Sequence, residues 1–165
     1  MEELARAPRV NVIVRGVIIA AESFEDSVED GSGYSLIATL FSFKVHRVLK
    51  GPRNLEVIEI YQSGGTLNGR TVMILDDPLM QVGDILILFL HSGVHHGEPG
   101  KYAVEGRPQG RFIVKGGQVF ALGEIPVSAD ERVQQEINTS TKHLHTEEIS
   151  EVEFIQQIQI ALSTN

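Results

Sequence analysis

The chain has 165 residues, of which 42% are hydrophobic and 22% charged, a composition typical of one globular domain. It contains no cysteine, so disulfides and thiolate chemistry are excluded, while the redox compartment stays undetermined. Acidic residues outnumber basic ones by 22 to 14, which gives a formal net charge of −8. A negative field disfavours nonspecific binding to nucleic acids and to anionic membrane surfaces.

The apolar runs and the first residues carry no membrane or targeting pattern. The longest wholly apolar run, Ile85–Leu90, is far shorter than the roughly 20 residues that a membrane-spanning helix needs. Met1–Arg9 has mixed charges and no apolar centre, unlike a signal peptide. We treat residues 1–9 as an N-terminal extension and residues 10–165 as a single domain. Two locations stay open, the cytoplasm and export by a leader that precedes Met1 and is cleaved.

Long stretches of β-branched residues predict strands in the first third of the chain. Val10–Ala21 is the first, and Gly16 within it indicates a bulge or bend. Glu25–Gly33 is acidic and rich in Gly and Ser, which predicts an exposed, mobile loop. Tyr34–Leu49 follows as a strand long enough to bend around a barrel. Its apolar face comprises Ile37, Thr39, Phe41, Phe43 and Val45.

Shorter strands are predicted in the middle of the chain. The apolar positions of Leu55–Gln62 change phase between Val57 and Ile58, so we expect a bulge or partial cover on both faces. The continuous apolar run Ile85–Leu90 predicts the most buried strand. Further strands are predicted at Arg70–Leu75, Tyr102–Glu105, and Arg111–Lys115 paired with Gln118–Leu122 across the two-residue turn Gly116-Gly117. Turns or loops are expected at Gly64-Gly65, Asp76–Met80, His91–Gly100 and Gly106–Gly110.

The last part of the chain has a helical pattern. Ser128–Ile137 is a polar candidate for a short helix, and Ser150–Leu162 is a stronger one. Ser150 and Glu153 form a capping box, and Ile149 and Phe154 stand at the positions of a hydrophobic staple. One apolar stripe, which we expect to pack on the rest of the domain, comprises Phe154, Ile155, Ile158, Ala161 and Leu162.

Short strands separated by glycine turns and followed by one helix predict a mainly β fold. The specific expectation is a five-stranded OB-like Greek-key barrel with an extra hairpin and a C-terminal helix over residues 150–163. We expect the strand residues Phe43, Val45, Ile87 and Phe89 to share one core, with the helix covering an open end of the barrel.

Two stretches, Val45–Gly51 (VHRVLKG) and Val82–Leu90 (VGDILILFL), occur in an order that resembles the netrin/TIMP-like family. The resemblance covers roughly residues 10–122 and extends to a helix with the sequence EFIQQIQIAL. It implies a five-stranded OB-type barrel flanked by helices, and a small prokaryotic version of the domain that is exported or held at the cell envelope. Metalloproteinase inhibitors of this family ligate the catalytic zinc through an N-terminal cysteine. This chain has none, so that mechanism is carried over to no residue.

Histidines are the most tempting candidates for a metal site. Imidazole is a common ligand of transition metals, and two clusters of histidines are able in principle to converge. Their spacing matches no metal motif, however, and loop histidines beside glycines are usually solvated. We therefore predict no bound metal. The weak candidates are His91, His95, His96, His143 and His145.

No stretch carries a catalytic signature. Ser42, Ser63 and Ser92 lie in no GxSxG motif. The pair Asp76-Asp77 precedes a proline and is interpreted as turn residues. Ser63–Thr66 has glycines but lacks the Lys-Ser/Thr ending of a phosphate-binding loop, so a β-turn is the better interpretation. We predict no enzyme, no catalytic residue and no cofactor.

The leading hypothesis is a noncatalytic binding module for another protein or a surface polymer, and we expect no nucleic acid as its partner. An OB-type nucleic-acid-binding protein is the alternative, because such folds use basic grooves and exposed aromatics. The basic residues are dispersed: Arg47, Lys50, Arg53, Arg70 and Arg107. The candidate stacking platforms are Tyr34, Tyr61 and Tyr102. A histidine-dependent metal-binding protein is the third hypothesis, and the oligomeric state is left open.

Overall fold

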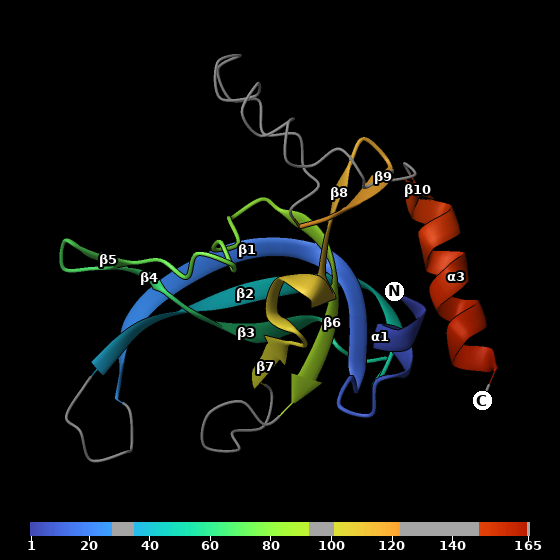
Figure 1. Cartoon of the computed structure of the whole chain (residues 1–165), viewed down its shortest axis with the longest axis horizontal. Coiled ribbons are helices and arrows are strands. Elements are labelled where there is room, and N and C mark those ends of the chain that lie inside the picture. Colours follow the sequence, from blue (N-terminus) through green and yellow to red (C-terminus); the bar gives the residue numbers. More distant parts are fainter. Residues whose placement is uncertain (28–34, 93–100, 123–148, 165) are drawn as a thin grey trace.

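A computed structural model describes residues 1–27, 35–92, 101–122 and 149–164 of the chain. The described part is mainly β with a C-terminal helix, as the sequence predicts (Figure 1). The strands are β1 Val12–Ser27, β2 Ser35–Lys50, β3 Val57–Ser63, β4 Gly65–Leu67, β5 Arg70–Val72, β6 Ile85–Ser92, β7 Lys101–Val104, β8 Arg111–Lys115, β9 Gln118–Ala121 and β10 Ile149–Ser150. The helices are α1 Glu2–Arg6, the 3₁₀ helix η1 Arg107–Gly110 and α3 Glu151–Ser163.

Eight strands form one sheet in the order β1-β2-β3-β7-β6-β8-β9-β10, and β4 and β5 form a separate two-stranded ribbon. A further pairing joins β1 to β6, so each of β1, β2, β3, β7 and β6 pairs with two of the others. All these pairings are antiparallel except that of β3 with β7, which is parallel. The long strands β1 and β2 curve around one side of the molecule (Figure 1).

Gly16 confirms the predicted irregularity in β1. The register of β1 against β2 shifts between Arg15 and Gly16. A Cβ atom at position 16 would overlap the backbone oxygen of Lys44 and approach the ring of Phe43. The close approach of the two strands therefore requires glycine at this position.

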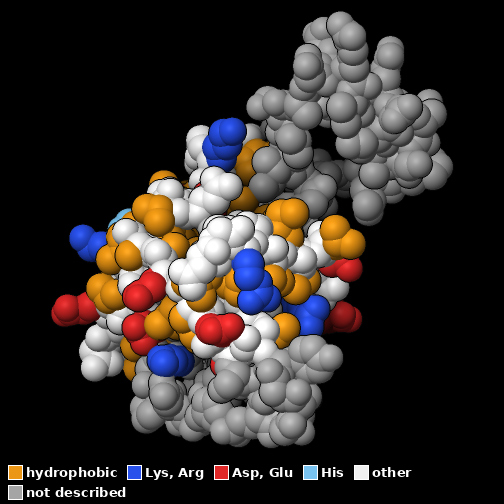
Figure 2. All heavy atoms as spheres, turned by 90° about the vertical axis from the view of Figure 1, so that its left-hand side faces the viewer, with side chains coloured by type: hydrophobic (Ala, Val, Ile, Leu, Met, Phe, Trp, Pro, Cys, Tyr) orange, Lys and Arg blue, Asp and Glu red, His pale blue; other side chains and the backbone are white. Residues whose placement is uncertain are grey.

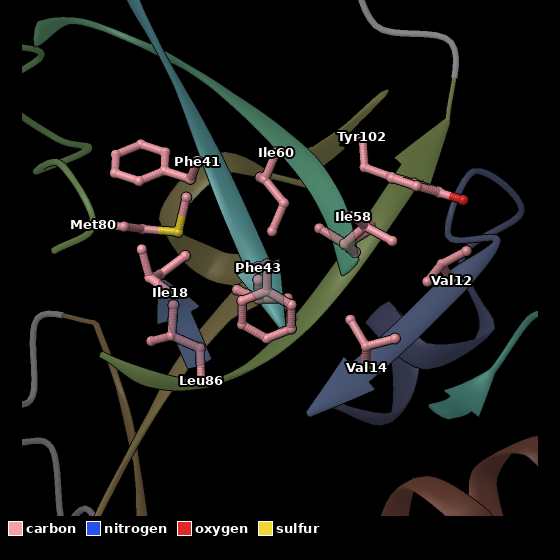
Figure 3. Packing of buried hydrophobic residues seen from close by; sticks show 12 residues of the cluster. Val12, Val14, Ile18, Phe41, Phe43, Ile58, Ile60, Met80, Leu86 and Tyr102 are labelled. Atoms are coloured by element: carbon pink, nitrogen blue, oxygen red, sulfur yellow. The ribbon is translucent and has the colours of Figure 1, made fainter. Parts of the chain in front are cut away.

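One hydrophobic cluster lies among β1, β2, β3, β6 and β7 (Figure 3). Alternate positions of each strand contribute to it, because side chains along a strand point to opposite faces in turn. Phe41 and Phe43 come from β2, with Val45 packed against the cluster. The other members are Val12, Val14, Ile18, Ile58, Ile60, Met80, Leu86, Leu88, Leu90 and Tyr102.

A second hydrophobic cluster lies on the outer face of β1, β6, β8 and β9, under α1 and α3. Ile87 and Phe89 belong to this cluster, and Phe43 and Val45 do not. The expectation of one shared core is therefore wrong. The period of two along β6 places Leu86, Leu88 and Leu90 on the inner face and the intervening residues on the outer one. The continuous apolar run in β6 thus reflects burial on both faces.

Helix α3 begins and packs as its sequence predicts. The hydroxyl of Ser150 accepts a hydrogen bond from the Glu153 amide at 3.2 Å. The members of the stripe that are buried in the outer cluster are Phe154, Ile155, Ile158 and Ala161. Residues 1–9, expected as an extension, include helix α1 (Glu2–Arg6), whose Ala5 is buried beside α3. The helices therefore cover the outer face of a sheet, where the sequence suggested the end of a barrel.

Several predicted boundaries change. Strand β1 continues to Ser27, so the first part of the expected Glu25–Gly33 loop pairs with β2, and residues 28–34 lie outside the described residues. Of the two alternatives for Leu55–Gln62, the bulge is wrong, because the pairing of β3 with β2 has no register shift. The outer face of β3 is exposed at Val57 and partly covered at Tyr61 and Ser63. The hairpin of β8 and β9 is confirmed, with positive φ at both turn glycines. The candidate helix Ser128–Ile137 lies outside the described residues.

Candidate ligand-binding cavity

A cavity of about 430 Å³ lies beside β3, β7 and η1, and the segment that follows β5 forms part of its wall. Leu36, Ile74 and Val104 supply an apolar wall. The polar side chains that line it are Tyr61, Gln62, Ser63, Asp77, His91, Arg107 and Arg111. This volume lies within the range of small-ligand sites in proteins, which are mostly apolar with a few placed polar groups.

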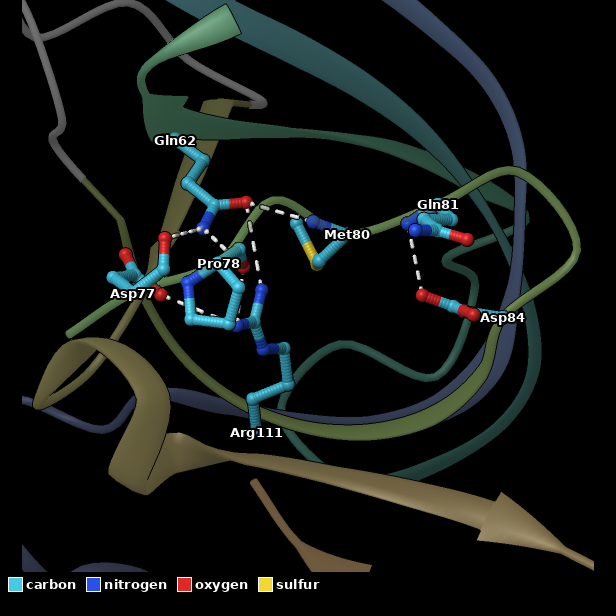
Figure 4. Close-up of polar contacts among 7 residues, drawn as sticks. All are labelled: Gln62, Asp77, Pro78, Met80, Gln81, Asp84 and Arg111. Carbon is cyan, nitrogen blue, oxygen red and sulfur yellow. Dashed lines mark hydrogen bonds and ion pairs between the residues drawn. The ribbon is translucent and has the colours of Figure 1, made fainter. Parts of the chain in front are cut away.

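A buried polar network forms the floor of the cavity (Figure 4). Arg111, at the start of β8, is only 2% exposed. Its Nη2 donates to Asp77 Oδ1 at 3.2 Å and to the Pro78 carbonyl at 2.6 Å. The Gln62 amide donates to the carbonyls of Asp77 and Pro78, and its Oε1 accepts from the Met80 amide at 3.2 Å. The network therefore ties the irregular chain before β6 to β3 and β8.

The cost of burying Arg111 is met mainly by this network. Burial lowers the pKa of its guanidinium, and the charge of Asp77 acts in the opposite direction. Its Nε has no hydrogen-bond partner and is buried. Because a buried charge is tolerated when it is paired and hydrogen-bonded, we interpret Arg111 and Asp77 as a positioning pair. They hold the segment that carries Ile74 against the cavity.

Some polar side chains of the cavity wall interact with a neighbouring side chain, and Arg107 has no such interaction with any described residue. His91 Nε2 lies 3.8 Å from Glu105 Oε2. The hydroxyl of Tyr61 donates to Asp26 at 2.8 Å, and burial, with this hydrogen bond second, raises the pKa of Tyr61 to about 12. Arg107, in contrast, is exposed and has no hydrogen bond or ion pair to any described residue. It also has a left-handed backbone, with φ of +57°.

The surface around the β4–β5 ribbon carries exposed apolar side chains. Figure 2 views the molecule from that side and shows hydrophobic side chains spread across the face, with charged ones scattered among them. Two of the most exposed large hydrophobic residues, Met73 and Leu75, directly follow β5 and flank the cavity residue Ile74. Exposed apolar side chains therefore lie directly before and after Ile74, a residue of the cavity wall.

The structure places only one of the predicted metal candidates. His91 lies in β6, not in the expected loop, and it lines the cavity. The other candidates, His95, His96, His143 and His145, lie outside the described residues. Among the residues that the structure describes, no three His, Asp or Glu side chains group as metal ligands would.

The described candidates for nucleic-acid binding lie in several different places. Tyr102 is buried in the inner cluster, and Tyr61 packs edge-on against Phe24 with its hydroxyl bonded to Asp26. Tyr34 lies outside the described residues. Among the basic candidates, Arg107 lines the cavity, while Arg47, Lys50 and Arg53 line two other concavities at the far end of β2.

Sequence reasoning missed the polar floor. Asp77, interpreted as a turn residue, is buried and paired with Arg111. Gln62 carried a usable signal, because it stands in phase with the buried Ile58 and Ile60 of β3. A glutamine on the apolar face of a strand needs buried partners. Arg111 stands at the first position of a strand and carried no such periodic signal.

No protein-family model matches the sequence, and a search of the curated proteins gives no match either. Within the described ranges, no helix combines the length and apolar character needed to cross a membrane.

Proposed function

We propose that the chain is a noncatalytic binding module of the netrin/TIMP-like type, built on an OB-like barrel, and that it binds a protein partner through the cavity beside β3 and β7. The ring of strand pairings, with its single parallel pair, supports the barrel. The two stretches of sequence that resemble the family support its type. Fold alone does not determine function, so the proposal rests on the cavity.

One observation carries the proposal: the cavity joins an apolar wall to a cation that has no partner among the described residues, over a floor that is already hydrogen-bonded. A fixed floor lowers the entropic cost of binding, because fewer groups must be ordered when the ligand arrives. The apolar wall supplies favourable burial, and the polar groups supply orientation. A short segment of a protein presents both kinds of group together.

The same observations favour a protein partner over an oligonucleotide. Single-stranded nucleic acids bind to exposed aromatic platforms along a basic groove. In the described residues, the aromatic candidates are buried or hydrogen-bonded, and only one of the basic candidates named above lines this cavity. The net charge of −8 also opposes the approach of a phosphate backbone.

Peptide display tests the proposal. A random peptide library is selected on the protein, and enriched peptides are measured against Ala103→Trp, which fills the cavity from β7. Ala20→Trp, at an exposed position of β1, is the matched control. We expect peptides that bind the parent and the control but not Ala103→Trp, while both variants keep their folded circular dichroism spectra. Peptides that bind all three proteins equally would refute the proposed site. Salt-sensitive micromolar binding of single-stranded oligonucleotides would favour the alternative.

A further inference from the structure

We propose that the cavity recognises a carboxylate that stands next to an apolar side chain, and that Arg107 is the residue that binds the carboxylate. The inference rests on the proposed function, because it names the chemistry of the ligand for the same cavity. It depends on three features of the described residues: the pairing of charges, the backbone of Arg107 and the shape of the apolar wall.

Charge pairing leaves one cation available. Of the acidic groups near the cavity, Asp77 pairs with Arg111, Asp26 accepts a hydrogen bond from Tyr61, and Glu105 lies 3.8 Å from His91. Arg107 alone among the charged side chains that line the cavity has no partner among the described residues. One guanidinium matches one carboxylate through two parallel hydrogen bonds. A phosphate dianion carries about twice the charge of a carboxylate, and a single guanidinium does not balance it.

The backbone at Arg107 is held in an unfavourable conformation. Both Gly106 and Arg107 have positive φ, at +67° and +57°, directly before Pro108. The following helix η1 is packed closely, since a Cβ at Gly110 would overlap the carbonyl of Glu105. A non-glycine residue with left-handed backbone persists only where the surrounding structure imposes it, and such residues cluster at ligand-binding sites. Glycine would adopt this backbone with less strain. We therefore infer that the side chain of Arg107 has a function that glycine lacks.

The apolar wall determines what accompanies the carboxylate. Leu36 is 49% exposed, and it lines the cavity together with Ile74 and Val104. A volume of about 430 Å³ accommodates one or two residues of a peptide, and not a folded surface. A carboxylate from the C-terminus of a chain and one from an acidic side chain share the required chemistry. The experiment therefore separates these two sources.

Titration of the ¹⁵N-labelled protein with short peptides tests the inference. The probes are acetyl-Ala-Leu with a free carboxylate, the same peptide ending in an amide, and acetyl-Leu-Glu-Leu-amide. We expect one or both of the peptides that carry a carboxylate to bind. The amide peptide should have an affinity lower by about 10-fold or more, because it lacks the hydrogen-bonded charge. Binding of the first alone would identify a chain terminus, and binding of the third alone an acidic side chain.

Variants at position 107 separate recognition from folding. Arg107→Gly should unfold at a higher temperature than the parent, because strain is relieved, yet lose at least 10-fold in affinity. Arg107→Ala should show the same loss of affinity. Arg53→Ala removes an arginine from a different concavity, at the end of β2, and should bind like the parent. Equal binding of the acid and amide peptides, unchanged affinity in Arg107→Ala, or no binding by either acidic peptide would overturn the inference. If displayed peptides depend on the cavity but need no carboxylate, the inference fails and the proposed function stands.

Discussion

Replacing Ile158 by alanine tests how α3 is attached to the sheet. Ile158 is fully buried in the outer cluster, among residues of α1, β1 and β6. The substitution removes three carbon atoms, which amounts to about 2.4 kcal/mol at roughly 0.8 kcal/mol for each buried group. The cavity left behind adds to this, so we expect a loss of about 2–5 kcal/mol in the free energy of unfolding.

Ile160 provides a matched control on the same helix. It is 62% exposed, and the same substitution there should change stability by only a few tenths of a kcal/mol. Urea denaturation followed by circular dichroism measures both variants. With a typical slope of roughly 1–3 kcal/mol per molar urea, Ile158→Ala should lower the midpoint by about 1 M or more. If the two variants have the same midpoint, α3 does not dock on the sheet in solution.

Three further predictions concern the polar network, a tyrosine and a glycine. Arg111→Met should cost about 3–5 kcal/mol of stability, because it leaves Asp77 buried and unpaired. The double variant Arg111→Met/Asp77→Asn should lose less stability than the two single variants added together, which a double-mutant cycle in urea would measure. The pKa of Tyr61 is raised to about 12. The stability that its protonated hydroxyl contributes is therefore fully present below about pH 10 and is lost as the pH rises through about 12. The absorbance change at 295 nm that Tyr61→Phe removes should therefore have its midpoint near pH 12, and a midpoint near 10 would contradict the burial. Gly16→Ala should destabilise strongly or prevent folding, since its Cβ would overlap the backbone of Lys44; a thermal midpoint equal to that of the parent would show that the strands separate easily.

Local patterns predicted the elements that depend on local physics. The hairpin over Gly116-Gly117 follows from the turn that two glycines favour, and both have positive φ. Helix α3 follows from its cap at Ser150 and its apolar stripe. The buried strand Ile85–Leu90 was also recognisable. Its division between two clusters was not, because a wholly apolar run does not say what covers each face.

The cavity was not predictable, because it depends on contacts between distant parts of the chain. Arg111 and Asp77 are 34 positions apart, and neither belongs to a periodic pattern. The structure instead shows that β3 and β8 meet the segment after β5 at one place. That Arg107 has no partner within the described ranges likewise depends on where the acidic groups lie in the fold. Such assignments require the tertiary structure.

The most direct test of the central claim is to map where an enriched peptide binds. Backbone amide shifts of the ¹⁵N-labelled protein are recorded as the peptide is added. We expect the largest changes on β3 near Tyr61–Ser63, on β7 and on η1, which surround the cavity. Largest changes on α3, or at the end of β2 near Arg47 and Arg53, would place the binding surface elsewhere and exclude the cavity as the binding site.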